Sequence, residues 1–329
     1  MRARIVGTGR SVPDRKLTNS ELEELVETSD DWIVARTGIE ERCIAAPEDA
    51  TSDLATRAAE AALESAGIAA SDLDVIMVAT ASPDMILPST AVLVQRNLGT
   101  GRPIPAFDFS AACSGFVYGL QFACDFAQAG RYQRMLLVGA ETLSRLVDYQ
   151  DRATCILFGD AAGAVVIEAV DGPGGIVSTC LKSDGEFWDL IHVPGGGSRR
   201  PASPYMLTQR EQYIRMNGRG VFKLAVPSME QALRDAAAGA GWKLDDVDYF
   251  LVHQANARIL EAVTERLGIE SDRVPTNIRH MGNTSAASIP VLMDECHRQG
   301  RFKPGDKLLI GAFGAGLTWG AAALEWTAA

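Results

Sequence analysis

The sequence predicts an α/β protein built from two duplicated halves, and two pairs of similar segments carry this prediction. In residues 66–78 an alanine-rich segment ends at a glycine and is followed by an aspartate-containing turn and an apolar run; residues 240–252 repeat this order. Residues 135–140 (MLLVGA) and 307–312 (KLLIGA) form the second pair. The period is far too long for a solenoid and indicates two halves of one protein.

Each half alternates strand-like apolar runs with alanine-rich helical segments. Runs such as 75–79 and 136–139 are apolar throughout, which is typical of strands covered on both faces. We therefore expect two α/β halves packed together, with central sheets and flanking helices. The turn-forming cluster 171–175 divides them into residues 1–172, which carry the candidate nucleophile, and 173–329, within one compact unit.

Composition and charge exclude several classes of protein. The net charge of −11 argues against a nucleic-acid binder. No stretch of about 18 apolar residues occurs, so no membrane-spanning helix is expected. Residues 1–12 predict a first strand rather than a signal peptide, which makes the cytoplasm the default location. The six cysteines show no C-x-x-C pair, so neither a metal site nor a disulfide framework is predicted.

Cys113 is the candidate nucleophile. It lies in Ser110–Gly115 (SAACSG), between an expected strand over 104–109 and a helix from about Phe116. Small residues permit a sharp strand-to-helix turn that lifts one side chain into a pocket. The helix N-terminus is expected to favour the thiolate, and the turn's own amide can join an oxyanion hole. On position alone, a buried core cysteine fits equally well.

His253 and Asn283 are the candidate partners of Cys113. His253 follows the apolar run 250–252, at the strand end where ligands gather in α/β sheets. A lone histidine is more often structural, and His192, His280 and His297 are assigned that role. Asn283 on its own fits a turn or a helix cap. The repeat sets His253 opposite Ala79 and Asn283 opposite Cys113, which predicts one shared pocket.

Three further segments are irregular. The glycine-rich residues 311–320 follow a strand, and their amides can supply a second oxyanion donor, although a turn of this kind on its own more often serves only close packing. Residues 82–89 predict a proline-bounded loop with exposed apolar side chains. Residues 194–212 predict a long surface loop, rich in glycine, serine, arginine and proline.

Four motifs together resemble the β-ketoacyl-acyl-carrier-protein synthase III family over essentially the whole chain. They are Ala112–Gly115 (ACSG), His253–Asn256 (HQAN), Gly282–Ser285 (GNTS) and Phe313–Gly316 (FGAG). The resemblance implies a thiolase-like fold with a layered αβαβα architecture. It also implies a fatty-acid-initiating acyltransferase without a resident cofactor, in which a coenzyme A thioester is the substrate.

The resemblance implies the roles of the reacting groups. Cys113 takes an acyl group from acyl-coenzyme A, and malonyl-acyl carrier protein then binds and loses carbon dioxide. His253 and Asn283 stabilise the resulting enolate, which attacks the acyl-cysteine. The amides of Cys113 and Ala315 form the oxyanion hole. Ala315 stands where the family has a glycine, but its amide is retained.

The binding residues are also implied by resemblance. Coenzyme A is assigned to Thr28, Trp32, Arg36, Arg152 and Asn256, with the adenine between Trp32 and Arg152. Carrier-protein docking is assigned to Lys223, Gln254, Ala255, Asn256, Ala257 and Arg258, with Arg219 as a further candidate. The acyl pocket is assigned to Leu87 and Phe313, where Leu87 often acts across a homodimer interface in the family.

Three alternatives remain open from the sequence. An acyltransferase of specialised metabolism moves the acyl group to another acceptor without condensation. A cysteine hydrolase also uses cysteine, histidine and asparagine. An interaction protein on the same fold is expected to lose one of these three residues. A thiolase is disfavoured because Gly314–Gly316 (GAG) lacks a second cysteine.

Overall fold

The computed structural model describes residues 1–328, which form two large mixed sheets and two small two-stranded ones. The first sheet has five strands, in the spatial order β1 (Arg2–Ser11), β7 (Asp160–Val170), β6 (Arg134–Thr142), β4 (Val75–Ala79) and β5 (Ala106–Phe109). The three strands β6, β4 and β5 are parallel, whereas β7 is antiparallel to both β6 and β1.

The second sheet repeats this arrangement. Its order is β8 (Gly175–Ser183), β13 (Thr318–Glu325), β12 (Lys307–Gly314) and β11 (Tyr249–Val252). Each strand corresponds in order and direction to β1, β7, β6 and β4. Within residues 1–328 only β5 has no counterpart. The duplication predicted from the sequence is confirmed.

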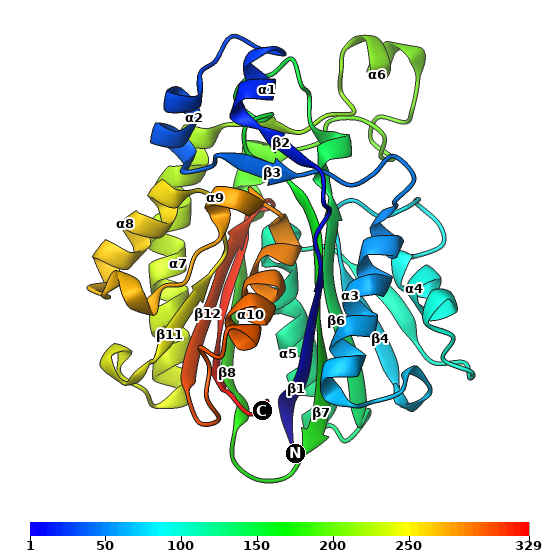
Figure 1. The fold of residues 1–329 in the computed structure, drawn as a ribbon, viewed down its shortest axis with the longest axis vertical. Helices are drawn as coiled ribbons and strands as arrows, with labels where there is room; N and C mark the ends of the chain where they lie inside the picture. The colour runs from blue at the N-terminus through cyan, green and yellow to red at the C-terminus, as the bar shows by residue number, and fades with distance from the viewer. Residues whose placement is uncertain (329) are drawn as a thin grey trace.

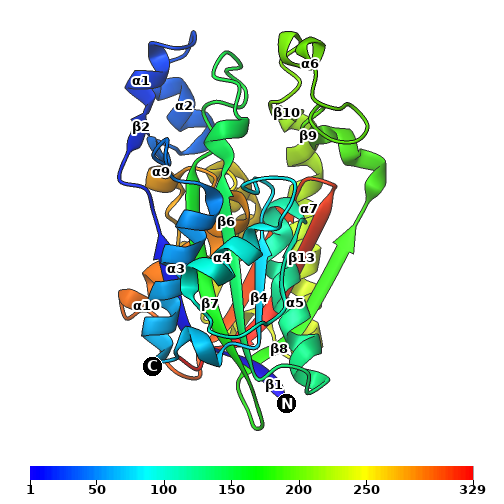
Figure 2. The ribbon, with the colours of Figure 1, turned by 90° about the vertical axis from the view of Figure 1, so that its right-hand side faces the viewer.

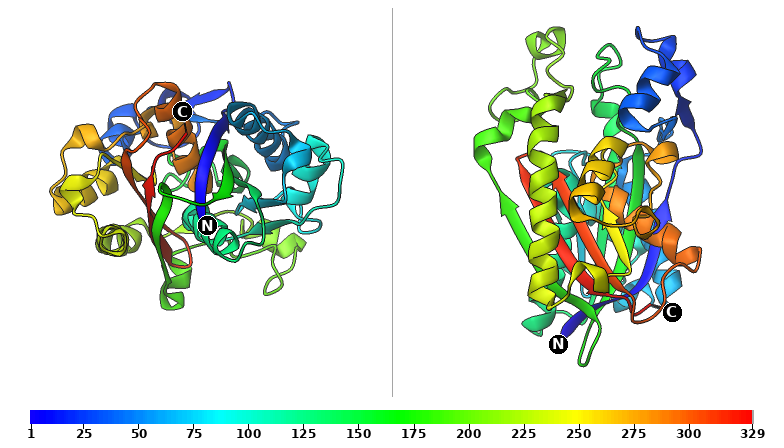
Figure 3. Two further views of the ribbon diagram at one scale, coloured as in Figure 1. Left: turned by 90° about the horizontal axis from the view of Figure 1, so that it is seen from below. Right: turned by 90° about the vertical axis from the view of Figure 1, so that its left-hand side faces the viewer.

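The two sheets and three pairs of helices stack into five layers (Figure 1). The pair α3 (Thr51–Ala66) and α4 (Thr90–Leu98) covers the outer face of the first sheet. The pair α5 (Gly115–Gln128) and α10 (Ser288–Arg298) lies between the sheets. The pair α7 (Gly218–Ala240) and α8 (Ala257–Leu267) covers the second sheet, and Figure 3 shows this layer edge-on.

Glycines let the central segments approach the first sheet closely. A Cβ atom on Gly163 in β7 would lie 2.6 Å from the backbone nitrogen of Val291 in α10. A Cβ atom on Gly139 in β6 would lie 2.2 Å from the carbonyl oxygen of Ala286. Both distances are below van der Waals contact, so larger residues would push the second half away from the first.

Short elements gather at one end of the molecule, away from the two termini (Figure 2). They are β2 (Lys16–Thr18), α1 (Asn19–Glu23), α2 (Asp30–Thr37), β3 (Glu41–Cys43), β9 (Ile191–His192), α6 (Pro204–Thr208), β10 (Arg215–Met216) and α9 (Ile278–Met281). The segment predicted as a long surface loop, 194–212, contains one short helix. Ser203 caps this helix, and Pro204 starts it with a preset φ.

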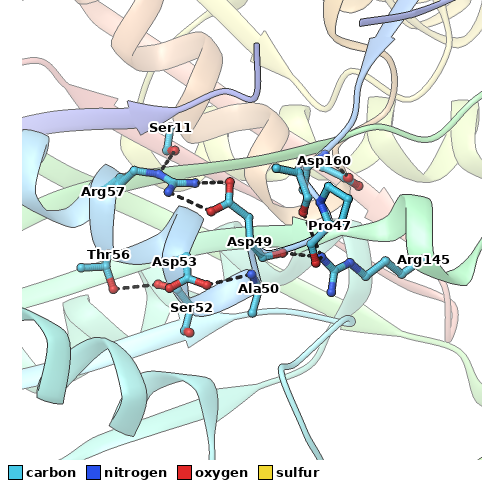
Figure 4. Close-up of polar contacts among 12 residues, drawn as sticks. Ser11, Pro47, Asp49, Ala50, Ser52, Asp53, Thr56, Arg57, Arg145 and Asp160 are labelled. Atoms are coloured by element: carbon cyan, nitrogen blue, oxygen red, sulfur yellow. Dashed lines mark hydrogen bonds and ion pairs between the residues drawn. The ribbon is translucent and has the colours of Figure 1, made fainter. Parts of the chain in front are cut away.

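Figure 4 shows how the segment before α3 is fixed to the first sheet. The Asp49 carboxylate accepts two hydrogen bonds from Arg57, at 3.0 and 2.8 Å. Asp53 accepts the Ala50 N–H at 2.8 Å and so starts α3. Asp160, at the start of β7, accepts the Ala45 N–H at 2.8 Å.

No helix within residues 1–328 is both long and apolar enough to cross a membrane.

Candidate active site

Cys113 lies in the sharp turn that the sequence predicts between β5 and α5. The turn is a single 3-10 segment, Ala112–Ser114, and Ala112 has a positive φ of 46°. Two hydrogen bonds with the second half hold the turn in place. Thr318 Oγ1 donates to the Ala111 carbonyl at 2.8 Å, and Ser114 Oγ donates to the Thr318 carbonyl at 2.9 Å. A conformation that non-glycine residues rarely adopt is thus held by packing on β13.

The expected thiolate is not supported. Burial, with a smaller contribution from the nearby Glu141 carboxylate, raises the pKa of the Cys113 thiol to about 12. Removal from water disfavours the charged sulfur more than the start of α5 stabilises it. Cys113 is therefore a thiol in the unliganded cavity, and a substrate or a base must assist its ionisation.

His253 presents one free ring nitrogen to the cavity. Its Nδ1 lies 2.6 Å from Ser288 Oγ, and the Gln254 N–H reaches that oxygen from the other side at 3.4 Å. The Ser288 hydroxyl can then donate to Nδ1, which leaves the proton of the neutral ring on Nε2. Burial lowers the pKa of His253 to about 3. Nε2 is buried without a partner in residues 1–328, so it is a donor aimed at a ligand.

Asn283 presents its amide nitrogen in the same way. Its Oδ1 accepts the Ser285 N–H at 2.9 Å, which leaves Nδ2 as the free donor. The backbone of Asn283 is bonded to the first half: its N–H donates to the Leu157 carbonyl at 2.8 Å, and its carbonyl accepts the Gly159 N–H at 3.0 Å. The side chain is thus held in position by residues more than 120 positions away in the sequence.

The repeat relates these residues differently from the sequence-based expectation. The turn Ser285–Ala287 before α10 is the counterpart of Ala112–Ser114 before α5, and Ser285 has a φ of 48° that matches Ala112. The counterpart of Cys113 is therefore Ala286, and Asn283 corresponds to Ser110. Setting Asn283 opposite Cys113 was wrong by three residues, yet the two turns pack together and bring both residues to one pocket.

A cavity of about 900 Å³ joins the candidate residues. Its lining includes the predicted residues Trp32, Arg36, Cys113, His253, Ala255, Asn256, Arg258, Asn283, Phe313 and Ala315. Its walls are mainly apolar, with polar groups near Cys113 and arginines at the mouth, which suits a thioester on a long polar carrier.

The sequence analysis missed several lining residues. Trp188, Met216, Arg219 and Phe222 form one wall of the mouth, and His192, assigned a structural role, lines it too. Arg219 had been considered only as a docking candidate. These residues lie in irregular segments or at the start of α7, where no periodic pattern marks them. The only sequence feature that could have marked them as cavity-lining residues was the unusual length of the segment before α7.

Other predicted residues lie outside the cavity of this chain. Leu87 is 83% exposed at the tip of the 82–89 loop, beside Ile86 at 85%. Thr28 and Ala257 are half-buried near the mouth, and Lys223 is exposed on α7. Gln254 is fully buried: its amide donates to the Val252 carbonyl and accepts from Thr276. Assigning Gln254 to a docking surface was therefore wrong.

Trp32 is stacked against both predicted coenzyme-binding arginines. The guanidinium carbons of Arg36 and Arg152 lie 4.2 and 4.5 Å from the ring centroid. Arg152 also donates to the Glu27 carbonyl at 2.9 Å. There is no room for a base between Trp32 and Arg152 at this separation, so Arg152 must swing aside before an adenine can stack there.

The fold and this cavity define a class. Two thiolase-like halves bring a cysteine, a neutral histidine and an asparagine to the wall of one mainly apolar cavity, as in cysteine-dependent acyltransferases. Family models described as 3-oxoacyl-[acyl-carrier-protein (ACP)] synthase III match residues 107–185, and those described as its C terminal match residues 237–326.

Whole-chain relatives agree with the family models. The chain is 48% identical to the beta-ketoacyl-[acyl-carrier-protein] synthase III of Caldanaerobacter subterraneus, over 99% of this chain and 98% of that one. A solved synthase III from Aquifex aeolicus has a TM-score of 0.91 at 44% identity and covers 98% of this chain and 100% of that one. The priming β-ketosynthase of a polyketide biosynthetic pathway has a TM-score of 0.92 at 32% identity and covers 99% and 97%. The chain belongs to the β-ketoacyl-acyl-carrier-protein synthase III family.

Proposed function

We propose that this enzyme condenses an acyl-coenzyme A primer with malonyl-acyl carrier protein, with loss of carbon dioxide, and so initiates fatty acid biosynthesis. The observation that supports this most directly is the pair of free donors beside Cys113. His253 Nε2 is buried without a partner, and Asn283 has its amide nitrogen free. Two neutral donors suit a thioester oxygen that becomes an enolate oxygen when carbon dioxide leaves.

The low basicity and the tautomer of His253 support condensation rather than hydrolysis. A hydrolase needs its histidine as a base toward the cysteine or water. Here burial lowers the pKa of His253, and the Ser288 contact favours the tautomer with Nε2 as donor. Decarboxylation itself generates the carbanion, so the condensation step needs no strong base and no resident cofactor.

The acyl-transfer step uses the two turns at Cys113 and Ala315. Gly314 packs directly on the Cys113 backbone, where a Cβ atom would lie 2.7 Å from the Cys113 nitrogen. This contact keeps the amides of Cys113 and Ala315 near one point, which suits an oxyanion hole. Phe313 lines the acyl side of the cavity. We assign coenzyme A to the mouth at Trp32, Arg36 and Asn256, with Arg152 closing over the adenine.

The carrier protein is assigned to the basic rim of the mouth. Arg258 on α8 and Lys223 on α7 are exposed, and Arg219 reaches the cavity. The Arg258 guanidinium lies 5.9 Å from the Phe222 ring centroid, which joins the two helices at the rim. On a chain with a net charge of −11, this local cluster is the feature that suits an acidic carrier.

A homodimer is proposed from the 82–89 loop. Met85, Ile86 and Leu87 are 45%, 85% and 83% exposed, and three consecutive exposed apolar side chains suit an interface. In a dimer, Leu87 can enter the partner's acyl pocket, in agreement with its position outside the cavity of its own chain. We place the enzyme in the cytoplasm, because a cysteine nucleophile needs a reducing compartment.

The test is intact-protein mass after mixing with acyl-coenzyme A primers of several lengths, followed by malonyl-acyl carrier protein. We expect one acyl mass on the wild type, none on Cys113→Ala, and discharge as a β-ketoacyl-carrier protein with release of carbon dioxide. The similarity to a priming β-ketosynthase of a polyketide pathway favours a second candidate, an acyltransferase of specialised metabolism. Acylation without discharge by malonyl-acyl carrier protein would select that candidate.

A further inference from the structure

The proposed decarboxylation requires two hydrogen-bond donors to meet at one oxygen atom. His253 Nε2 and Asn283 Nδ2 must both point at the thioester oxygen as it becomes an enolate oxygen. His253 follows β11, whereas Asn283 lies in a separate segment between α9 and α10. Because hydrogen bonds weaken steeply when they are misaligned, the contacts that fix these two segments to one another determine how well both donors fit the same atom.

Gln254 connects the two segments through its side-chain amide. This side chain is fully buried and donates from Nε2 to the Val252 carbonyl at 2.7 Å. Its Oε1 accepts from the Thr276 hydroxyl at 2.8 Å and from the Asn277 N–H at 3.1 Å. The Val252 carbonyl can only accept and the Asn277 N–H can only donate, so these partners define the orientation of the amide. One amide group thus bridges the end of β11 and the residues that lead into α9.

A second set of contacts holds the chain on the other side of Asn283. Ser288 Oγ lies 2.6 Å from His253 Nδ1 and accepts the Gln254 N–H at 3.4 Å. Ser288 is the first residue of α10 and follows directly after the Ser285–Ala287 turn. The segment that carries Asn283 is therefore bonded to the pair His253 and Gln254 at both of its ends.

The segment to which the Gln254 amide is bonded is itself fixed. Asn277 Nδ2 donates to Glu295 Oε2 in α10 at 2.6 Å, and Glu295 Oε1 lies 3.2 Å from Arg10 Nη1 in β1. This segment thus has contacts in both halves of the chain. Gln254 does not line the cavity formed by residues 1–328, although the adjacent His253 does. It can therefore act on a substrate only through the residues that it holds.

We propose that Gln254 is a positioning residue that fixes His253 and Asn283 relative to one another for decarboxylation. The proposal rests on the proposed function, which assigns both donors to the enolate oxygen. Glutamine suits this role because its amide has a donor at one end and an acceptor at the other, as the Val252 carbonyl and the Asn277 N–H require. Hydrogen bonds of this kind, behind the reacting groups, hold catalytic side chains in their productive geometry.

The test compares the wild type with Gln254→Met, which keeps the length of the side chain without its hydrogen bonds. Two steps are measured: decarboxylation of malonyl-acyl carrier protein, as kcat and KM, and acylation of Cys113 by acyl-coenzyme A, as intact mass. We expect kcat for decarboxylation to fall by about 10- to 100-fold, the loss that a displacement of about 1 Å can cause. The KM and the acylation rate should stay at their wild-type values, because Gln254 is buried and does not line the cavity.

Thr276→Val tests the same contact from the other side. It removes one donor to Gln254 Oε1 and leaves the Asn277 N–H in place, so kcat should fall by about two- to fivefold. Thr276 is an exposed residue, so this variant should fold even if Gln254→Met does not. The double variant should be no slower than Gln254→Met, because both changes remove the same hydrogen bond. Gln95→Met, which removes a hydrogen bond to the Ile104 carbonyl in the outer layer, is the matched control and should alter neither step.

The positioning role is overturned if Gln254→Met keeps the wild-type kcat, or if it raises KM alone, as loss of a docking residue would. Equal losses in decarboxylation and acylation, with a lower melting temperature, would mean that Gln254 only stabilises the fold. If Gln254→Met does not fold, Thr276→Val decides: a lower kcat at an unchanged KM supports the role, and an unchanged kcat overturns it. If the wild type itself does not decarboxylate malonyl-acyl carrier protein, the proposed function fails rather than the positioning role.

Discussion

The turns Ala112–Ser114 and Ser285–Ala287 follow the same backbone path but carry different chemistry. Each starts with a residue at positive φ, 46° and 48°, and each leads into a central helix. In the first half the second residue is Cys113, which lines the cavity; in the second half it is Ala286, which packs against Gly139. The two halves thus contain two turns of equivalent backbone conformation. The side chain of one turn is the candidate nucleophile, whereas that of the other packs against β6.

The largest effect is expected from moving the nucleophile between the two turns. Cys113→Ala should lower kcat by on the order of 10⁶-fold, as removal of a catalytic nucleophile does. The double variant Cys113→Ala with Ala286→Cys should not recover, because Ala286 is buried outside the cavity. Condensation assays and intact mass measure both. Acylation at the new cysteine would show that the two turns can exchange the role of carrying the nucleophile.

The next largest effect distinguishes the role of the hydrogen-bond donors His253 and Asn283, in the second half, from that of the nucleophile Cys113, in the first half. His253→Ala or Asn283→Ala should slow malonyl-carrier decarboxylation by about 10²- to 10³-fold, the cost of one lost oxyanion-type donor. Acylation of Cys113 should be little affected. His297→Ala, which removes a histidine that packs on Trp326, is the matched control. Equal losses in both steps would mean that His253 also acts on the thiol.

The two halves should respond to pH in opposite directions. Burial lowers the pKa of His253 from 6.5 to about 3, so the unfolded state binds a proton first and the free energy of unfolding falls as pH drops through this range. Burial raises the pKa of Glu141 from 4.5 to about 7, so the free energy of unfolding falls as pH rises from 4.5 to 7.

Urea unfolding of His253→Gln and Glu141→Gln across pH measures these contributions. We expect His253→Gln to remove the fall in the free energy of unfolding that occurs as the pH drops below 6.5. We expect Glu141→Gln to remove the fall that occurs as the pH rises from 4.5 to 7. By linkage the contribution is on the order of 5 kcal/mol for His253 and 3 kcal/mol for Glu141. Parallel curves for the wild type and a variant would show that its buried group titrates alike in the folded and unfolded states.

A smaller effect tests the packing between the halves. Gly139 in β6 corresponds to the buried Ala312 in β12, and Gly139 lies directly against the Ser285–Ala287 turn of the other half. Gly139→Ala should lower the free energy of unfolding by about 1–3 kcal/mol through overpacking on Ala286. Ala312→Gly should cost only about 1 kcal/mol. Denaturant unfolding compares the two variants, and equal costs would mean that a methyl group at Gly139 does not strain the contact with Ala286.

The smallest effect concerns the rim. Arg258→Glu should raise KM for malonyl-acyl carrier protein by about tenfold and more at low salt, because rim charges mainly steer association. Lys303→Glu makes the same charge change on an exposed residue outside the main cavity and should have little effect. A similar rise in both variants would mean that net charge, rather than the Arg258 rim, attracts the carrier.

Local sequence patterns determined the elements and the reacting residues. The apolar run 75–79 became β4 with its predicted bounds, and the small residues around Cys113 gave the predicted turn. Hydrophobic periodicity and turn-forming residues act over a few neighbouring positions, so both can be read from a single sequence. The repeat predicted two sheets for the same reason, because each half folds by the same local rules.

Only the tertiary structure decided how these residues act on one another. Asn283 was set opposite Cys113 from the sequence, but the strained turns align Cys113 with Ala286. The ionisation of Cys113 was expected to follow the helix that it precedes, yet burial outweighs that helix. Desolvation and contacts across more than a hundred residues depend on what finally surrounds a group, and no local pattern records that environment.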